Sequence, residues 1–326
     1  MIQQYTNTTT ATNYGNEQLT HGTNVPVRKN TIQNTHNNNN TPDNDDDGQF
    51  YDITLTGEIS GPFPRHLDRT LPSTNQYALT KTHCGGTVMG SKPEEYIETP
   101  RSFETRCRSG NIIVNSTKYS NVAYKPTLVS RAVHLIRNPF DNVVARWHYL
   151  QKHWANHNKT DALELYNNTR EGFHAWCAYS NEYTKQHFVT SRFVDYELYS
   201  LATGRGGREA NTANESSSSI FIPCRDEFIR YTLWHNNAIE VIKKRQLPSY
   251  TLYYENYTTN WHTTIDEILQ FINLQPASTN STPLEFITGK HYVEEYYTTQ
   301  QQKATKELVH ELSSYETWNL LQHYFL

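Results

Sequence analysis

The stretch from Ser130 to Trp154 reads SRAVHLIRNPFDNVVARWHYLQKHW, and it decides the fold because a strand pattern runs directly into a helix pattern. Residues 130–137 form a short apolar run, which predicts a buried strand. Asn138 is a favoured capping residue, Pro139 suits the first helical position, and Asp141 stands where a capping box places an acid. Apolar side chains then recur on one helical face, namely Phe140, Val143, Val144, Trp147, Leu150 and Trp154. We therefore expect a helix that begins where the strand ends.

Strand and helix patterns alternate along the rest of the chain. Residues 77–83 (YALTKTH) and 249–255 (SYTLYYE) are predicted to be further strands. Helices are predicted at residues 139–153, 172–189, 225–245, 263–273, 299–312 and 315–324. Because strands alternate with helices, we expect an α/β fold whose mainly parallel sheet is flanked by helices.

Composition limits the class of protein. At 326 residues the chain can bury a substantial core, which favours one large α/β domain. The net charge of −4 means that a polyanionic partner would need a local basic cluster, so nucleic acid is disfavoured as a partner. No apolar run approaches the roughly 20 residues of a bilayer span, and residues 1–20 do not resemble a secretory signal. We expect no membrane span in this chain.

Two polar segments border the expected domain. Residues 1–48 are rich in Asn and Thr and have few apolar side chains, so most of this segment is expected to be mobile. Residues 49–326 form the expected domain, with a polar surface loop at 202–219. The GRGG of that loop is not a phosphate loop, because no strand precedes it and no GK[ST] follows it.

Cysteines and glycosylation motifs leave the compartment open. The four cysteines show no CxxC or zinc-like spacing, and Cys177 with Cys224 is the pairing that we favour. Acceptor motifs for N-glycosylation begin at Asn7, Asn39, Asn115, Asn158, Asn167, Asn214, Asn256 and Asn280. About six would arise by chance in a chain this rich in Asn, Ser and Thr, so the excess is small.

Two strand ends carry chemically useful side chains. Arg137 stands where the strand meets the helix, and its planar guanidinium together with N–H groups at a helix start could bind a phosphate. The alternative is that Arg137 pairs with a structural carboxylate. At the other strand end, Lys81 and His83 are two residues apart, so a strand would direct both to one face. A histidine can remove a proton from a hydroxyl while a lysine stabilises charge, although a lone histidine is more often a partly buried structural residue.

This combination resembles the sulfotransferases that use 3′-phosphoadenosine 5′-phosphosulfate (PAPS). LTKTHCGG is similar to their catalytic KTH segment, and HLIRNPFDNVVARWHY to their segment for the 3′-phosphate. TLYYENYTTNWHTTIDEILQFINL and YYTTQQQKATKELV are similar to two later family segments, in the expected order over residues 76–326. The resemblance is greatest to carbohydrate-type sulfotransferase-like proteins of algae.

The resemblance implies a role for each matching residue. His83 would be the general base, Lys81 would stabilise the transferring sulfuryl group, and Tyr254 would flank the adenine. Arg137 would bind the 3′-phosphate, and Asn138 is assigned to the same nucleotide site. Lys290 is a further expected phosphate contact. The family fold is like that of P-loop NTPases, the donor is PAPS, and the reaction is expected to need no metal.

Three departures from the family pattern stand in the sequence. Ala145 replaces the serine that usually lies eight positions after the arginine, which removes a hydroxyl donor and costs about 1 kcal/mol. Of the C-terminal glycine-rich motif only Gly289 and Lys290 remain. The first strand and its PxSGT-type phosphate loop are absent, and TNTTTATNYG (residues 6–15) resembles the family segment directly after that loop, so we expect an upstream piece with the loop and a membrane anchor.

Two classes of function are therefore weighed. One is a sulfotransferase acting on a hydroxyl or amine of a carbohydrate or small acceptor, placed by resemblance in the Golgi, with the cytoplasm as the alternative. The other is a non-catalytic protein of the same fold that binds a glycan or a partner, which the missing loop favours. A nucleotide kinase is disfavoured because neither the loop lysine nor a magnesium-holding acid is visible.

Overall fold

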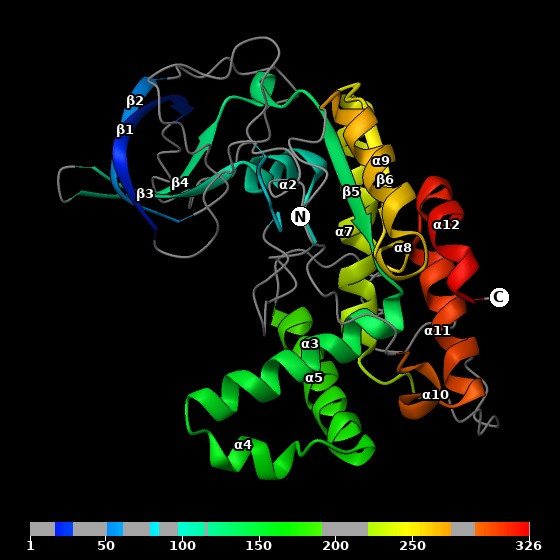
Figure 1. Ribbon diagram of the computed structural model, residues 1–326. Helices are drawn as coiled ribbons and strands as arrows, with labels where there is room; N and C mark the ends of the chain where they lie inside the picture. Colours follow the sequence, from blue (N-terminus) through cyan, green and yellow to red (C-terminus); the bar gives the residue numbers. More distant parts are fainter. Residues whose placement is uncertain are drawn as a thin grey trace.

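Figure 1 shows a computed structural model of the chain. It describes residues 17–28, 51–60, 79–84, 97–114, 117–190, 221–274 and 291–325. Of the N-terminal segment predicted to be mobile, the described part is a strand, β1 (Glu17–Arg28). The predicted loop at 202–219 and residues 6–15 lie outside the described residues.

The fold is mixed α/β, and its parallel part is a pair of strands. β5 (Ala132–Ile136) and β6 (Ser249–Tyr253) run parallel, with Ala132 opposite Ser249 and Ile136 opposite Tyr253. Both lie inside the predicted strands at 130–137 and 249–255. In the third predicted strand, Leu79 forms a single bridge and residues 80–83 are not in a strand, so that prediction was wrong for the end that carries the motif.

An antiparallel sheet was not predicted. Its strands are β1, β2 (Tyr51–Ser60), β3 (Ser109–Val114) and β4 (Thr117–Tyr124). They pair in the order β1-β2-β3-β4, and β4 pairs back with β1, which closes the sheet. The expectation of a mainly parallel sheet is therefore wrong for the described strands. β2 alternates Tyr51, Ile53, Leu55 and Ile59 with polar residues, a strand pattern that the sequence prediction overlooked. β1 and β3 both have irregular register, and their sequence signal is weaker.

All six predicted helices are present. They are α3 (Pro139–Asn156), α5 (Arg170–Thr190), α7 (Arg225–Lys244), α9 (Trp261–Ile272), α11 (Thr299–Leu312) and α12 (Tyr315–Leu321). Sequence patterns missed α2 (Pro100–Cys107), α4 (Thr160–Leu165), α8 (Asn256–Thr259), α10 (Val293–Tyr296) and the 3₁₀ turns η2 (Pro126–Leu128) and η3 (Gln322–Phe325). The missed elements have eight residues or fewer, so they span too few turns for a periodic pattern.

The main core lies around the start of α3. The predicted stripe of α3 is buried as far as Leu150, and Trp154 is half-buried. It packs with Phe173 of α5 and Phe228 of α7. β5 departs from expectation, because His134 and Ile136 are buried while Val133 and Leu135 are 39% and 47% exposed. The strand was predicted to be buried, but among the described residues only one of its faces is covered.

Two disulfides connect segments that are distant in the sequence. The favoured pairing of Cys177 with Cys224 is confirmed, and it links α5 to the residue before α7. A second bond joins Cys84 to Cys107 at the end of α2. Within the described ranges, no helix is both long and apolar enough to cross a bilayer.

Candidate functional site

The junction between β5 and α3 is closed by local hydrogen bonds. The side chain of Asn138 caps α3, because its oxygen accepts from the N–H groups of Phe140 and Asp141 at 2.9 and 3.3 Å. The predicted cap and the start at Pro139 are thereby confirmed. The predicted reciprocal bond from Asp141 is not formed, since the N–H of Asn138 donates to Glu255 Oε1 at 2.8 Å instead.

Glu255 follows β6 closely and holds the two strand ends together. Its other oxygen, Oε2, accepts from the hydroxyl of Tyr324 at 2.6 Å. Pro139 has no N–H to offer. The N–H groups of Asn138, Phe140 and Asp141, which surround it in the sequence, all have partners. The expectation that this helix start would offer unpaired N–H groups to a phosphate was therefore wrong for the described structure. The assignment of Asn138 to the nucleotide site stays a prediction.

Arg137 lies against the residue that follows β6. Its guanidinium carbon is 4.7 Å from the centre of the Tyr254 ring, a cation–π contact. The N–H of Tyr254 donates to the carbonyl of Ile136 at 2.7 Å, which fixes the two neighbouring side chains beside each other. No carboxylate of the described residues forms an ion pair with Arg137. The structural ion pair considered as an alternative is therefore not found in this part of the chain.

The segment before α10 also meets the start of α3. The N–H of Tyr292 donates to Asp141 Oδ1 at 2.8 Å, and His291 lies 3.3 Å from Oδ2. This long-range use of Asp141 explains why it does not complete the capping box. Burial raises the pKa of the Tyr292 phenol, and the charge of Arg137 acts in the opposite direction, so the two groups are close enough to interact. Lys290 lies outside the described residues.

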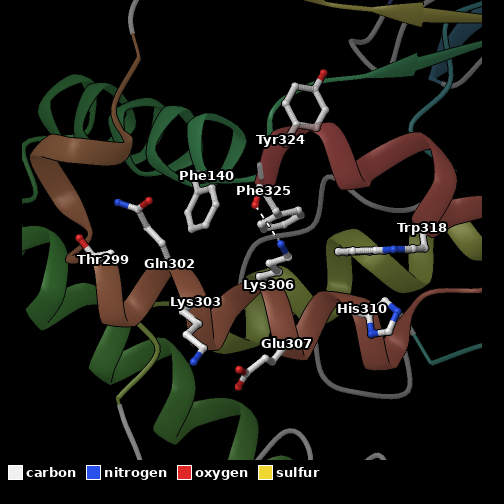
Figure 2. A pocket seen from close by; sticks show the side chains of 10 residues that line it. All are labelled: Phe140, Thr299, Gln302, Lys303, Lys306, Glu307, His310, Trp318, Tyr324 and Phe325. Atoms are coloured by element: carbon white, nitrogen blue, oxygen red, sulfur yellow. Dashed lines mark hydrogen bonds between the residues drawn. The ribbon is translucent and has the colours of Figure 1, made fainter.

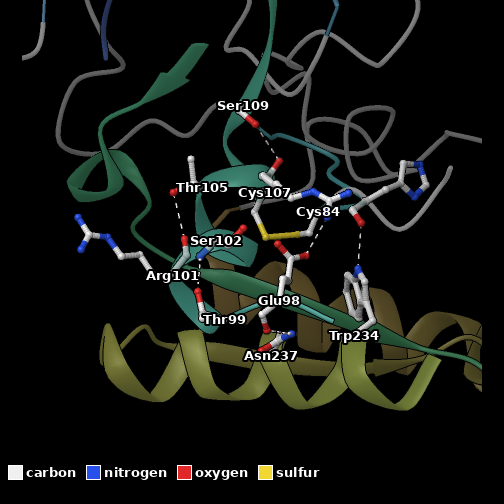
Figure 3. Close-up of polar contacts among 12 residues, drawn as sticks. Cys84, Glu98, Thr99, Arg101, Ser102, Thr105, Cys107, Ser109, Trp234 and Asn237 are labelled. Carbon is white, nitrogen blue, oxygen red and sulfur yellow. Dashed lines mark hydrogen bonds and ion pairs between the residues drawn. A yellow bond between two sulfur atoms is a disulfide. The ribbon is translucent and has the colours of Figure 1, made fainter. Parts of the chain in front are cut away.

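The KTH segment is held at its carboxyl end. The indole N–H of Trp234 on α7 donates to the main-chain oxygen of His83 at 2.9 Å (Figure 3). The hydroxyl of Thr82 accepts from the N–H of Cys84 at 3.1 Å, and Cys84 has a left-handed φ of 48°. The chain therefore turns directly after His83, where the disulfide to Cys107 anchors it.

Burial and charge affect His83 in the same direction. The side chain is half-buried, and burial, followed by the charge of Lys81, lowers the pKa of His83. The imidazole is therefore neutral at neutral pH and can accept a proton. Lys81 itself is exposed.

Helix α2 is clamped onto α7 beside this segment. The guanidinium of Arg245 donates to both carboxylate oxygens of Glu104, at 2.7 and 3.0 Å. Arg106 pairs with Glu98 at 3.2 Å, and the amide of Asn237 donates to the main-chain oxygen of Glu98 (Figure 3). Because Cys107 ends α2, these bonds also fix the anchor of the KTH segment.

One turn of α7 connects the two predicted sites. The hydroxyl of Tyr231 donates to the main-chain oxygen of Arg137 at 2.7 Å, while Trp234 holds His83. Residues three apart on a helix are neighbours on its surface, with Cβ atoms about 5–6 Å apart. The structure thus brings the backbones of His83 and Arg137 to one face of one helix. The sequence patterns assigned neither Tyr231 nor Trp234 to a site.

A buried histidine pair lies behind this contact. Nε2 of His134 and Nδ1 of His235 are 2.7 Å apart, and both side chains are almost fully buried. Burial lowers the pKa of His134 to about 4 and that of His235 well below its usual value. The ring of His134 is 5.9 Å from that of Trp234. The pair therefore supports the wall that holds the KTH segment.

A half-open hollow of about 660 Å³ adjoins the other side of the α3 start. Trp318 and Phe325 stack in its wall with ring centres 5.8 Å apart, and the ammonium of Lys306 donates to the main-chain oxygen of Phe325 (Figure 2). Phe140 and Tyr324 also line it. This hollow touches neither His83 nor Arg137, but Tyr324 connects it to Glu255.

Comparisons with known proteins give no family for this chain. No protein-family model, no curated protein and no solved structure matches it. In the described part of the chain, no three His, Cys, Asp or Glu side chains come together in a way that could hold a metal ion. The geometry of the KTH segment and of the junction between β5 and α3 is therefore the basis for a functional proposal.

Proposed function

We propose that this chain is a PAPS-dependent sulfotransferase that acts on a hydroxyl or amine of a carbohydrate or small acceptor, on a P-loop-NTPase-like sulfotransferase fold. The motif resemblance over residues 76–326 motivates the proposal. The observation that carries it is the pair of bonds from Tyr231 and Trp234, which hold the Arg137 junction and the KTH segment within one turn of α7. Two disulfides favour an oxidising compartment, in agreement with the Golgi expectation.

The residues present fit one end of the donor nucleotide. A phosphate would be bound by the guanidinium fork of Arg137. Because the N–H groups at the start of α3 have partners, the helix would contribute its dipole but no direct bond. Arg137 covers one face of Tyr254, so an adenine would have to contact the ring edge or the opposite face.

The KTH residues would perform the transfer. The acceptor oxygen attacks the sulfur, the bond between sulfur and the phosphate oxygen breaks, and the acceptor proton passes to His83. The lowered pKa keeps His83 neutral and ready for this proton. The ammonium of Lys81 would stabilise charge on the sulfuryl oxygens. The leaving group is 3′-phosphoadenosine 5′-phosphate (PAP).

Transfer of label from sulfur-labelled PAPS to a panel of carbohydrate and small-molecule acceptors tests the proposal in the natural full-length protein. His83→Ala should reduce turnover by at least about 100-fold and leave PAP binding intact. His153→Ala, at an exposed position of α3, is the control and should leave turnover unchanged. Turnover that survives His83→Ala would remove His83 as the base.

The nucleotide assignment has its own matched control. Arg131 lies at the opposite end of β5 and makes a similar cation–π contact, 5.3 Å from the ring centre of Phe271. Arg137→Ala should weaken PAP binding about 30-fold, or about 2 kcal/mol, whereas Arg131→Ala should not weaken it. Arg137→Lys should recover only part of the loss, because lysine lacks the planar fork. Equal calorimetric affinities for Arg137→Ala and Arg131→Ala would refute the assignment.

The N–H groups at the start of α3 already have partners, and this favours one other function, that of a non-catalytic binding protein with the same fold. The aromatic wall of Trp318 and Phe325 would then bind a glycan through stacking on its apolar face. This function predicts no transfer to any acceptor, together with glycan binding that Trp318→Ala abolishes. Measured transfer would exclude it.

A further inference from the structure

Two acceptor motifs for N-glycosylation lie at opposite ends of α4. Asn158 precedes Lys159 and Thr160 in the turn between α3 and α4, and Asn167 precedes Asn168 and Thr169 in the turn between α4 and α5. Both asparagines are exposed. Helices α3, α4 and α5 project away from β5 and β6 (Figure 1), so a chain of sugars at either position would extend into solvent.

Asn158 has the geometry of a helix-ending residue with a projecting side chain. Its φ is 51°, directly after the cap of α3, a position where Asn and Gly are common. Its main-chain N–H donates to Ala155, so the backbone is fixed independently of the side-chain amide. A hollow of about 370 Å³, lined in part by Trp154, lies beside it and offers space and an aromatic surface for a first sugar.

Asn167 is held through its amide oxygen. The hydroxyl of Thr169 donates to that oxygen at 2.7 Å, and the same hydroxyl accepts from the N–H of Gly172 in the first turn of α5. The nitrogen of the amide, to which a glycan is attached, makes no hydrogen bond to a described residue. Replacing one of its hydrogens therefore breaks no contact in the described structure.

We propose that Asn158 and Asn167 carry N-linked glycans. The side-chain nitrogen bonds to the first sugar carbon of a lipid-linked oligosaccharide, the bond from that carbon to the lipid pyrophosphate breaks, and the nitrogen loses a proton to the transferase. The two disulfides indicate the oxidising lumen in which this reaction takes place. The motif at Asn256 differs, because that residue is half-buried at the start of α8. The proposal does not depend on the sulfotransferase assignment.

The test is peptide mapping of the protein from its natural cells after enzymatic glycan release in heavy-oxygen water. Release converts each glycosylated Asn to labelled Asp, so label is expected at residues 158 and 167. Unlabelled peptides at both positions overturn the proposal, and one unlabelled peptide overturns it for that residue.

Variants of the full chain, expressed behind a cleavable secretory leader, assign the sites separately. Thr160→Ala and Asn167→Gln should each remove one step of the glycan-dependent gel shift, and the double variant should remove two. Thr160→Ser keeps the motif and should leave the shift unchanged. Glycans are added before folding is complete, so the shift is also read in retained protein if a variant is not secreted. A ladder that none of these variants changes contradicts the proposal.

Discussion

Acidification should destabilise the protein through its buried histidine pair. His134 and His235 are 5% and 4% exposed, and their ring nitrogens share one hydrogen bond of 2.7 Å. The aromatic rings that contact them are those of Tyr231 and Trp234, which carry no charge at neutral pH. A proton taken up here would be buried without a carboxylate partner among these neighbours, which is why both pKa values are lowered.

The sign and the size of the effect depend on the pKa of His134. In the unfolded chain it protonates near pH 6.5, whereas in the folded protein its pKa is about 4. Between these values the unfolded state binds more protons, so stability falls as the pH falls, by about 1.4 kcal/mol per pH unit for each histidine. At pH 5 His134 alone should cost about 2 kcal/mol and His235 adds to this cost, a large share of the roughly 5–15 kcal/mol that stabilises a typical domain.

Asp226 acts in the opposite direction and must be separated from the pair. Burial raises the pKa of its carboxyl to about 6, so the folded state binds this proton first and gains stability as the pH falls between about 6 and 3.8. The measurement is urea unfolding from pH 7.5 to 5 for the wild type and the double variant His134→Gln/His235→Gln. The difference between the two free energies of unfolding cancels Asp226 and should change by about 2–4 kcal/mol. Parallel pH profiles would refute the assignment of two neutral buried histidines.

Two further predictions concern the stability of the fold. Gly172→Ala should destabilise the protein by more than about 1 kcal/mol in thermal unfolding, because the added Cβ would overlap the main-chain oxygen of Asn167; an unchanged melting temperature contradicts this. The double variant Cys84→Ser/Cys107→Ser removes the disulfide between residues 23 positions apart, and it should lower the free energy of unfolding by about 3 kcal/mol. This double variant should also reduce the rate of sulfuryl transfer more than the affinity for PAP. Loss of the Cys177–Cys224 disulfide should lower stability but should not affect transfer more than PAP binding.

The local parts of this fold were predictable from the sequence. The start of α3 depends on Asn138 and Pro139, which act on their immediate neighbours. Likewise α11 begins and ends where its pattern predicts, and Thr298 and Gln301 form a capping box there. These signals require only residues within one turn of each other, so a single sequence contains them.

The long-range contacts of the candidate site were not predictable. The carboxylate of Glu255 accepts from the N–H of Asn138, 117 positions away in the sequence. The indole N–H of Trp234 donates to the main-chain oxygen of His83, 151 positions away. Neither hydrogen bond can be recognised from neighbouring residues, because nothing next to Glu255 or Trp234 in the sequence indicates its distant partner. The motif supplied the candidates His83 and Arg137, whereas only the fold shows which helix holds them.

The position of Glu255 determines how an anion could be bound at this site. In a phosphate site built on a helix start, backbone N–H groups share the charge, and the loss of one side chain is partly compensated. Here Glu255 and Asn138 already occupy those N–H groups, so among the described residues at this junction most of the attraction for a phosphate must come from Arg137. A carboxylate so close also repels the phosphate unless Tyr324 and Asn138 keep their bonds to it. Tyr324→Phe should therefore weaken PAP binding although it touches no ligand, and unchanged calorimetric affinity would show that the phosphate does not approach this junction.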